Sequence, residues 1–339
     1  MDWTRGYTAE WDVRRVNPDT WADEGSVAGI GSISVTRTRD DSVRLLETAS
    51  MEVEDALDTG WYRLYLIAKQ GGTERFPLAT MLFEQIKSRS DHGKVATARG
   101  RSVLQPAADI KFYRGCYTPS GTDAAKWCAK AISQCIPAPV HVAGEFALSE
   151  DKNHAPGTSV LKAVWDVLDA GGFCMRISGT GEVTIGPLPT EAALRLDKAN
   201  AGLLVPGVDD DFDLTDVPNR YIAVFDGGEV FVATNEDETS TVGYPQRGRW
   251  VDADTDTSPS PLAGESRQAY VERRLRELST VTRRFSYTRE YWPDCVPYDL
   301  VSASLADNGV DGELRIVSQS ITRGNGAVVS EVAGKEVTL

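Results

Sequence analysis

The segment PGTSVLKAVWDVLDAGGFCMRISGTGEVTIGP, residues 156–187, predicts a helix followed directly by a β-hairpin. Thr158 or Ser159 can cap a helix over VLKAVWDVLDA, and Gly171-Gly172 can end it. The apolar stripe of this helix has the spacing of one helical face and consists of Val160, Leu161, Val164, Val167 and Leu168. The following FCMRISGTGEVTIGP alternates like two strands and turns at Gly179-Thr180-Gly181.

A second amphipathic helix precedes this segment. Thr122-Asp123 opens DAAKWCAKAISQC, and Pro137 and Pro139 stop it. Its predicted apolar face consists of Trp127, Ala131, Ile132 and Cys135. Residues 113–200 therefore predict a small α+β domain with two helices and a β-hairpin.

The sequence before this domain is typical of strands. Segments 31–38, 45–54, 61–69 and 94–103 are rich in β-branched residues or alternate in character. Residues Thr73 to Ser88 leave two alternatives open, because they fit one long strand or hairpin arm but also a helix from Leu78 to Lys87. Several strands at short spacing predict a barrel or sandwich over residues 1–112.

The sequence after residue 200 returns to strands. RYIAVFDGGEVFVAT, residues 220–234, predicts a hairpin around Asp226-Gly227-Gly228, and Ser266–Leu278 predicts a third helix. Four more strands are expected at 281–292, 298–306, 312–324 and 327–339. The polar stretch Asn235 to Pro261 predicts an exposed, mobile loop. The predicted fold class is α+β, mainly β, with domains at 1–112, 113–200 and 201–339, the last containing a helix near 265–278.

Composition excludes several classes of protein. The chain has 339 residues, and 50 acidic against 36 basic side chains give a net charge of −14. Broad nucleic-acid binding relies on an excess of Lys and Arg, so this balance disfavours it. Apolar runs stay short of the roughly 20 residues of a membrane helix, and the polar N-terminus predicts no signal peptide. Five cysteines without a CxxC pair fit reduced thiols in a cytosol.

Candidate catalytic and metal-binding residues do not form a known pattern. His92, His141 and His154 lack metal-ligand spacing, and we expect His92 and His154 in solvated loops and His141 in a strand. The apolar surroundings of three cysteines predict inert buried thiols at Cys128, Cys135 and Cys174. The sequence contains no GxSxG, and Gly179-Thr180-Gly181 lacks the third glycine of a dinucleotide loop.

Two charged clusters were considered as sites. The acidic run Asp209–Asp213 lacks the glycine and glutamate of a calcium loop, which favours a solvated linker and leaves an opportunistic cation site as the alternative. The basic cluster Arg273, Arg274, Arg276, Arg283 and Arg284 favours a solvated helix face or an interface with salt bridges to an acidic neighbour. We therefore predict no catalytic, cofactor-binding or metal-ligating residue and no cofactor.

Four stretches carry a resemblance to a known family: 60–68 (GWYRLYLIA), 121–132 (GTDAAKWCAKAI) with 156–187, 217–227 (VPNRYIAVFDG) with VATNED and YPQRGRWV after it, and 270–305. Together they resemble the baseplate-hub or tail-tip hub proteins of tailed bacteriophages, prophages and related contractile injection systems. One departure is that Tyr298-Asp299 stands where that family often has Gly-Asp.

The resemblance implies two tail-tube-like β-barrel domains around the inserted α+β domain. It implies a homotrimeric ring that joins the tail tube or a distal tail protein to a spike or tip protein. DNA would pass through its lumen without sequence-specific binding. The expected location is the virion tail or baseplate, assembled in the host bacterial cytoplasm, without stable membrane insertion. Because the chain ends at Leu339 without a fused hydrolase, no enzymatic activity is expected.

Physical reasoning adds two expectations. Carboxylates in the β-domains would line the channel and repel phosphates, and the arm 73–104 would pair across subunits and so cover strand edges. Two alternatives stay open: a carbohydrate-binding or host-adhesion module with an exposed aromatic platform, and a hydrolase that uses carboxylates or a cysteine.

Overall fold

The computed structural model describes residues 1–339 except 40–41, 55–56, 91–93, 198–199, 201–202, 260, 262–263, 294, 306–309, 324–326 and 339. The side chains of 85–90, 94–95, 305, 323 and 338 also lie outside the description. Strands make up 48% of the chain and helices 14%, which confirms an α+β fold that is mainly β. The contacts define two compact units: unit 1 is Met1–Val208 with Ser286–Ala333, and unit 2 is Asp209–Phe285 with Gly334–Leu339.

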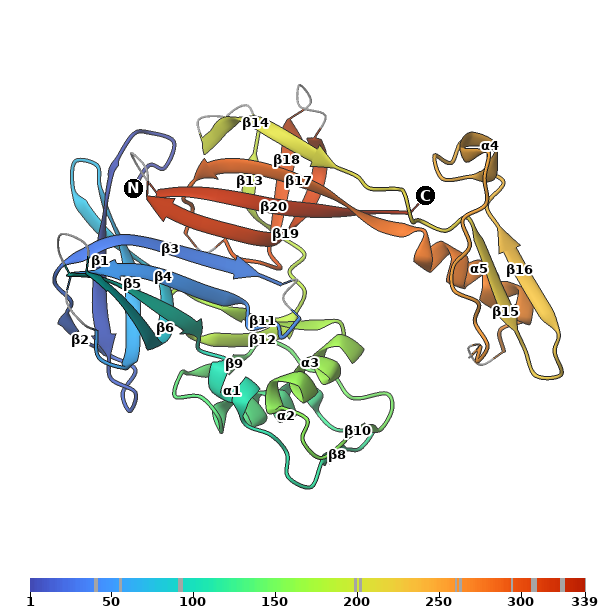
Figure 1. The fold of residues 1–339 in the computed structure, drawn as a ribbon, viewed down its shortest axis with the longest axis horizontal. Helices are drawn as coiled ribbons and strands as arrows, with labels where there is room; N and C mark the ends of the chain where they lie inside the picture. Colours follow the sequence, from blue (N-terminus) through green and yellow to red (C-terminus); the bar gives the residue numbers. More distant parts are fainter. Residues whose placement is uncertain are drawn as a thin grey trace. The chain divides into compact units, whose positions relative to one another are not determined.

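One large sheet contains strands from both ends of the chain (Figure 1). Among the described residues its order is β14-β17-β20-β19-β3-β4-β7-β6-β5-β1-β2, with β18 also beside β19 and β13 beside β18. The strands that precede the α+β segment are β1 Thr8–Val16, β2 Asp23–Ser26, β3 Ile30–Thr38, β4 Glu47–Val53, β5 Gly60–Lys69, β6 Thr73–Ser90 and β7 Lys94–Ser102. The strands that follow it are β13 Ala192–Leu196, β14 Leu204–Asp211, β17 Thr280–Glu290, β18 Leu300–Leu305, β19 Val310–Arg323 and β20 Ala327–Thr338.

The strand β6 settles the alternative at Leu78–Lys87, where no helix forms. It pairs with β5 through Leu64↔Ala79 and with β7 through Ile86↔Ala98. β5 takes backbone hydrogen bonds of β6 as far as Phe83, and β7 takes those from Met81 onward. The extended conformation therefore satisfies groups that a helix would otherwise pair internally.

The α+β segment between β7 and β13 contains the predicted helices and hairpin. Its elements are α1 Gln105–Asp109, β8 Cys116–Thr118, α2 Ala124–Ser133, β9 Val140–Val142, β10 Lys152–His154, α3 Val160–Ala170, β11 Phe173–Ile177 and β12 Val183–Pro187. The side chains of Ser159 and Asp123 cap α3 and α2 by accepting from the amides of Lys162 and Lys126. Gly171 caps the C-terminus of α3, as the Gly-Gly pair predicts.

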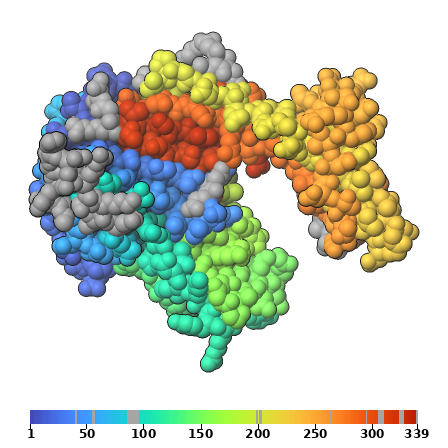
Figure 2. Space-filling view, viewed as in Figure 1, coloured from blue at the N-terminus to red at the C-terminus, as the bar shows by residue number. Residues whose placement is uncertain are grey.

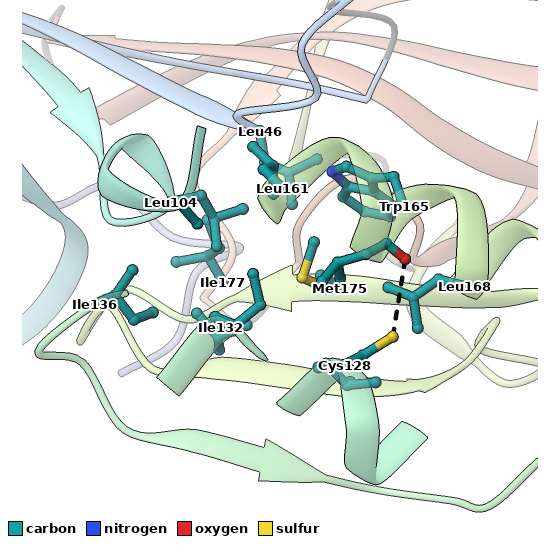
Figure 3. Packing of buried hydrophobic residues seen from close by; sticks show 14 of the residues in the cluster. Leu46, Leu104, Cys128, Ile132, Ile136, Leu161, Trp165, Leu168, Met175 and Ile177 are labelled. Carbon is teal, nitrogen blue, oxygen red and sulfur yellow. Dashed lines mark hydrogen bonds between the residues drawn. The ribbon is translucent and has the colours of Figure 1, made fainter. Parts of the chain in front are cut away.

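The buried face of α2 differs from the predicted one. Cys128 and Ile132 are fully buried together with Ala124 and Ala125, whereas Trp127, Ala131 and Cys135 are only partly buried. The face is rotated because α2 packs against α3, and the Sγ of Cys128 lies 3.8 Å from the Val164 carbonyl oxygen (Figure 3). Figure 3 shows Leu161, Leu168, Met175 and Ile177 in the same cluster.

The turn of the β11–β12 hairpin is anchored to the large sheet. The Trp21 Nε1 and the Arg63 Nη2 both donate to the Thr180 carbonyl oxygen, at 2.9 and 3.0 Å. The Thr80 hydroxyl donates to the Gly179 carbonyl oxygen at 3.2 Å. These contacts join two parts of unit 1 that lie far apart in sequence.

Unit 2 is built on a hairpin and a helix. Its elements are β15 Arg220–Val224, β16 Val230–Thr234, α4 Tyr244–Arg247 and α5 Arg267–Leu278. The hairpin and the third helix form as predicted, and Ser266 caps α5. Tyr221, Phe225, Tyr270 and Val271 are among the residues of its core.

The stretch from Asn235 to Pro261 is predicted as an exposed, mobile loop, and most of its described residues are exposed. The Asn219 Nδ2 donates to the carbonyl oxygens of Val242 and Arg249, both at 3.0 Å, and the Val251 amide donates to the Asn219 Oδ1 at 2.7 Å. Val242 is fully buried. A single buried asparagine therefore anchors this stretch, a role that polarity along the sequence does not reveal.

Among the described helices, none is both long and apolar enough to cross a membrane. The division into domains at residues 112 and 200 stays a prediction.

Replacing Gly179 by alanine should destabilise unit 1, because a Cβ there would lie 1.9 Å from the Pro77 carbonyl oxygen, a backbone atom that cannot turn away. We expect a loss of about 1–3 kcal/mol in the free energy of unfolding, measured by urea denaturation. Gly72→Ala is the matched control, since nothing lies within 4 Å of its added Cβ. Equal stability of the two variants would contradict the anchoring role of this turn.

Candidate functional site

The outer face of β3, β4 and β19 is lined by hydroxyl groups. The residues of this hydroxyl face are Ser34 and Thr36 on β3, Thr48 and Ser50 on β4, and Ser318 and Ser320 on β19. The register places Ser34 opposite Ser50, and Thr36 opposite both Thr48 and Ser320. Figure 2 shows the β19–β20 and β3–β4 segments, coloured red and blue, side by side on one surface. Strand alternation explains the pattern, because the intervening residues point into the core.

Two arginines extend the hydroxyl face onto β7. Arg99 lies opposite Ser50, and Arg101 lies opposite Thr48. Both arginines are exposed, and both line a cavity of about 400 Å³ that also includes Ser34, Thr36 and Gln105. Gly100 stands between them on the inner side, where a Cβ would lie 2.8 Å from the Phe83 ring.

The inner face of the large sheet carries two buried clusters, together called the buried ion network. The first is Arg37 with Glu47, and the second is Glu331 on β20 with Gln319 on β19 and with Tyr287 and Arg289 on β17. The Arg37 Nε lies 2.9 Å from the Glu47 Oε1, and the Arg289 Nη2 lies 2.6 Å from the Glu331 Oε2. The Gln319 Nε2 donates to the Glu331 Oε2 at 2.6 Å, and the Tyr287 hydroxyl donates to the Glu331 Oε1. All six side chains are buried. Charges removed from water need such partners, since an unpaired buried ion is costly.

Glu47 is the least satisfied member of the network. Its Oε2 is buried and has no hydrogen-bond partner among the described residues. Burial raises the pKa of Glu47 to about 7, although the nearby Arg37 guanidinium acts in the opposite direction.

A third buried acid stands at the start of β18. The Asp299 carboxylate is 2% exposed, and its Oδ1 lies 2.7 Å from the Arg176 Nη1 on β11. Burial raises the pKa of Asp299 despite this partner. The preceding Tyr298 has a φ of 79°, in the left-handed region that favours glycine. Glycine adopts this conformation without strain, which explains why the resemblance leads one to expect Gly-Asp where this chain has Tyr298-Asp299.

The three cysteines predicted as buried thiols, Cys128, Cys135 and Cys174, show no sign of activation. Cys128 and Cys174 are buried as predicted, and burial raises the pKa of Cys174 to about 11. Cys135 is only partly buried, contrary to the prediction, and burial still raises its pKa. A nucleophilic cysteine needs a lowered pKa, so neither shift favours catalysis.

The histidines are spread over separate elements. His141 lies in β9 as predicted, 3.6 Å from the Glu182 carboxylate. His154 was predicted in a solvated loop, but it is 8% exposed in β10, and burial lowers its pKa. The position is not a loop, because His154 pairs with Cys116 in the short β8–β10 ribbon. His92 lies outside the described residues. No group of three or more His, Cys, Asp or Glu side chains in the described chain could hold a metal ion.

The two charged clusters meet within unit 2. Asp209 to Asp211 belong to β14 rather than to a linker, because the strand continues through them. The Asp210 carboxylate accepts from Arg283, which lowers the pKa of Asp210. On α5, Arg273 pairs with Glu265 at 2.8 Å and with Glu277 at 2.7 Å. Arg273 and Arg283 therefore form salt bridges within the chain. The acidic neighbour that was predicted for the basic cluster belongs, for these two arginines, to the same chain.

Sequence reasoning missed the hydroxyl face, the cavity beside it and the buried ion network. The alternation of Ser and Thr with apolar residues in SISVTRT and ETASMEV is a signal that could have shown the hydroxyl face. No comparable signal existed for the network, because its members come from strands that lie up to about 290 residues apart.

Several solved structures share this fold. The tail protein from Neisseria meningitidis MC58 aligns over 98% of this chain and 97% of its own, with 12% identity and a TM-score of 0.65. The 43 kDa tail protein of prophage MuSo2 from Shewanella oneidensis aligns over 96% and 98%, with 14% identity and a TM-score of 0.62. A prophage tail protein from Listeria monocytogenes EGD-e aligns over 96% and 94%, with 12% identity and a TM-score of 0.54.

No family model and no curated protein matches the sequence. The structural matches show that the chain has the fold of phage and prophage tail proteins. The resemblance stated from the sequence is therefore confirmed at the level of fold.

Because burial raises the pKa of Glu47, the protonated Glu47 side chain stabilises the folded state, and we expect this stabilisation to be lost as the pH rises. Unfolded glutamate has a pKa near 4.5, so the folded state binds this proton more tightly. The contribution is complete below pH 4.5 and disappears as the pH rises through about 7. Relative to Glu47→Gln, we expect the wild-type free energy of unfolding to fall by about 3 kcal/mol across this range.

Urea denaturation between pH 4.5 and 8 measures this difference. Glu52→Gln is the control, because Glu52 lies on the exposed face of the same strand. The same pH slope in the wild type and in Glu47→Gln would refute the assignment.

Proposed function

We propose that the protein is a non-enzymatic structural component of a phage-type tail or baseplate, in which three copies form a hub ring. The ring joins the tail tube or a distal tail protein to a spike or tip protein, and it surrounds the channel through which DNA passes. The observation that carries this proposal is fold similarity to tail proteins along nearly the whole of both chains.

The strand edges of unit 1 support assembly with further chains. β6 pairs with β5 only as far as Phe83, opposite Gly60, whereas it continues along β7 to Ser90, opposite Lys94. Among the described residues, β6 therefore has a partner strand on one side only from Glu84 onward. Unpaired edges recruit strands from other molecules, so a neighbouring copy that pairs with the arm 73–104 is part of the proposal.

The proposed ring also assigns roles to the predicted domains. The segments 1–112 and 201–339 would take equivalent tube-like, barrel-forming positions, with 113–200 inserted between them. The net charge of −14 supports a channel that repels phosphates rather than one that holds DNA. The protein would act in the virion tail after assembly in the host bacterial cytoplasm.

The oligomeric mass tests this proposal. Light scattering of the purified chain should give about 111 kDa for three copies of the 36.9 kDa chain, and images should show threefold rings. Mixing with the tube and spike proteins from the same tail should stabilise the rings if they dissociate on dilution. A chain that stays monomeric both alone and with these partners would refute the trimeric hub.

A second candidate function, carbohydrate binding at the tail tip, is favoured by two exposed aromatic side chains. Tyr113 is 97% exposed and Tyr117 is 61% exposed, and the Tyr117 hydroxyl donates to the Asp151 carboxylate at 2.8 Å. Exposed tyrosines can stack on sugar rings. If the chain is an adhesion module, glycan-array binding should be present in the wild type and lost in Tyr113→Ala. No binding, or binding that Tyr113→Ala retains, would eliminate this candidate.

A further inference from the structure

We propose that the cavity beside Arg99 and Arg101 is a phosphate-binding site that holds consecutive phosphate groups of a single-stranded nucleic acid backbone. This inference goes beyond the proposed structural role, because neither the fold nor the net charge of the chain leads to it. It rests on two arginines that have no carboxylate partner in the described part of the chain, on the hydroxyl groups around them and on the cavity that these residues line.

The two arginines are free to bind an anion. Among the described residues, neither Arg99 nor Arg101 forms an ion pair with a carboxylate. The Arg101 Nη1 lies 3.3 Å from the Gln105 Oε1, and the Gln105 Nε2 in turn donates to the Asp109 Oδ1 at 2.8 Å. Gln105 therefore acts as a positioning residue for Arg101 and leaves the guanidinium charge uncompensated.

The spacing of the arginines suits a polymer. They occupy successive outward positions on β7, so their Cα atoms lie about 6.8 Å apart at the rise of an extended strand. Each arginine has its own row of hydroxyls, Ser34 and Ser50 beside Arg99, and Thr36 and Thr48 beside Arg101. One arginine with two hydroxyl residues therefore occurs twice along β7, and each set could hold one phosphate group.

The donor set favours phosphate over carboxylate. A planar carboxylate is satisfied by one bidentate guanidinium, whereas phosphate oxygens accept from arginine and from hydroxyl groups at the same time. Four hydroxyl residues and two arginines line the same 400 Å³ cavity. Such contacts position a backbone without reading its sequence.

One carboxylate limits the affinity. Glu52 follows Ser50 at the next outward position of β4 and lies opposite Thr97, one row beyond Arg99. Its negative charge opposes phosphate binding without neutralising either arginine, since no ion pair joins them. The site is therefore expected to bind weakly and in a strongly salt-dependent manner, which is compatible with a strand that slides past.

Fluorescence anisotropy with a labelled single-stranded DNA oligonucleotide tests the site on the full chain. Arg99→Gln/Arg101→Gln should lower the affinity by about tenfold or more and reduce the slope of log K against log salt by about 1.4, for two single-strand phosphate contacts. Glu52→Gln should raise the affinity. Arg195→Gln, at an exposed arginine on β13, is the matched control and should leave binding unchanged.

Two further probes separate the sources of phosphate. A methylphosphonate oligonucleotide, which has the same bases and a neutral backbone, should not bind, and pyrophosphate should compete with the DNA. Binding of pyrophosphate alone would overturn the assignment to nucleic acid. Absence of all binding, or DNA binding that the double variant retains, would overturn the site itself. Light scattering on the same samples reports the oligomeric state separately, so the two proposals can fail independently.

Discussion

The pairing of β3 with β19 is the constraint on which the large sheet depends. It brings residues 30–38 and 310–323 together, with Thr38 opposite Ser318 and Val35 opposite Ile321. Through this ladder the strands before the α+β segment and the strands after it become one sheet. Closing so long a loop is costly in chain entropy, and the pairing must therefore be supported by side chains as well as by backbone hydrogen bonds.

The buried ion network provides this support and also specifies the register. Arg37 lies directly opposite Gln319 across the β3–β19 ladder, and each has its own buried glutamate partner. A slip of one residue would turn Arg37 outward and place a hydroxyl residue in the core. Buried ion pairs stabilise little in net terms, so specificity of pairing is the better explanation for their presence.

The same alternation that buries the ion network exposes the hydroxyl face. Arg37 and Glu47 lie on the inner side of β3 and β4. The outer side presents small polar groups, Glu52 and, on β7, two arginines. Burial raises the pKa values of the Cys135 and Cys174 thiols, which does not favour their use as nucleophiles.

Local features could be predicted from the sequence because neighbouring residues decide them. The caps at Asp123 and Ser159, the Gly171-Gly172 terminus and the two hairpin turns all formed as expected. The resemblance also led to the correct fold, and the departure at Tyr298 marked a position with positive φ. The buried face of α2 and the environment of His154 could not be predicted, since the elements that cover them are brought by folding.

Sequence alone determined helices α2, α3 and α5, the two hairpins, the acidic charge and the likeness to tail proteins, because these depend on short-range spacing and composition. Only the tertiary structure decided that Arg37, Glu47, Arg289 and Glu331 are buried together, and that Arg99 and Arg101 border a cavity. The physical reason is that a strand's period of two assigns residues to two faces, but the partners of the strand decide which face is covered.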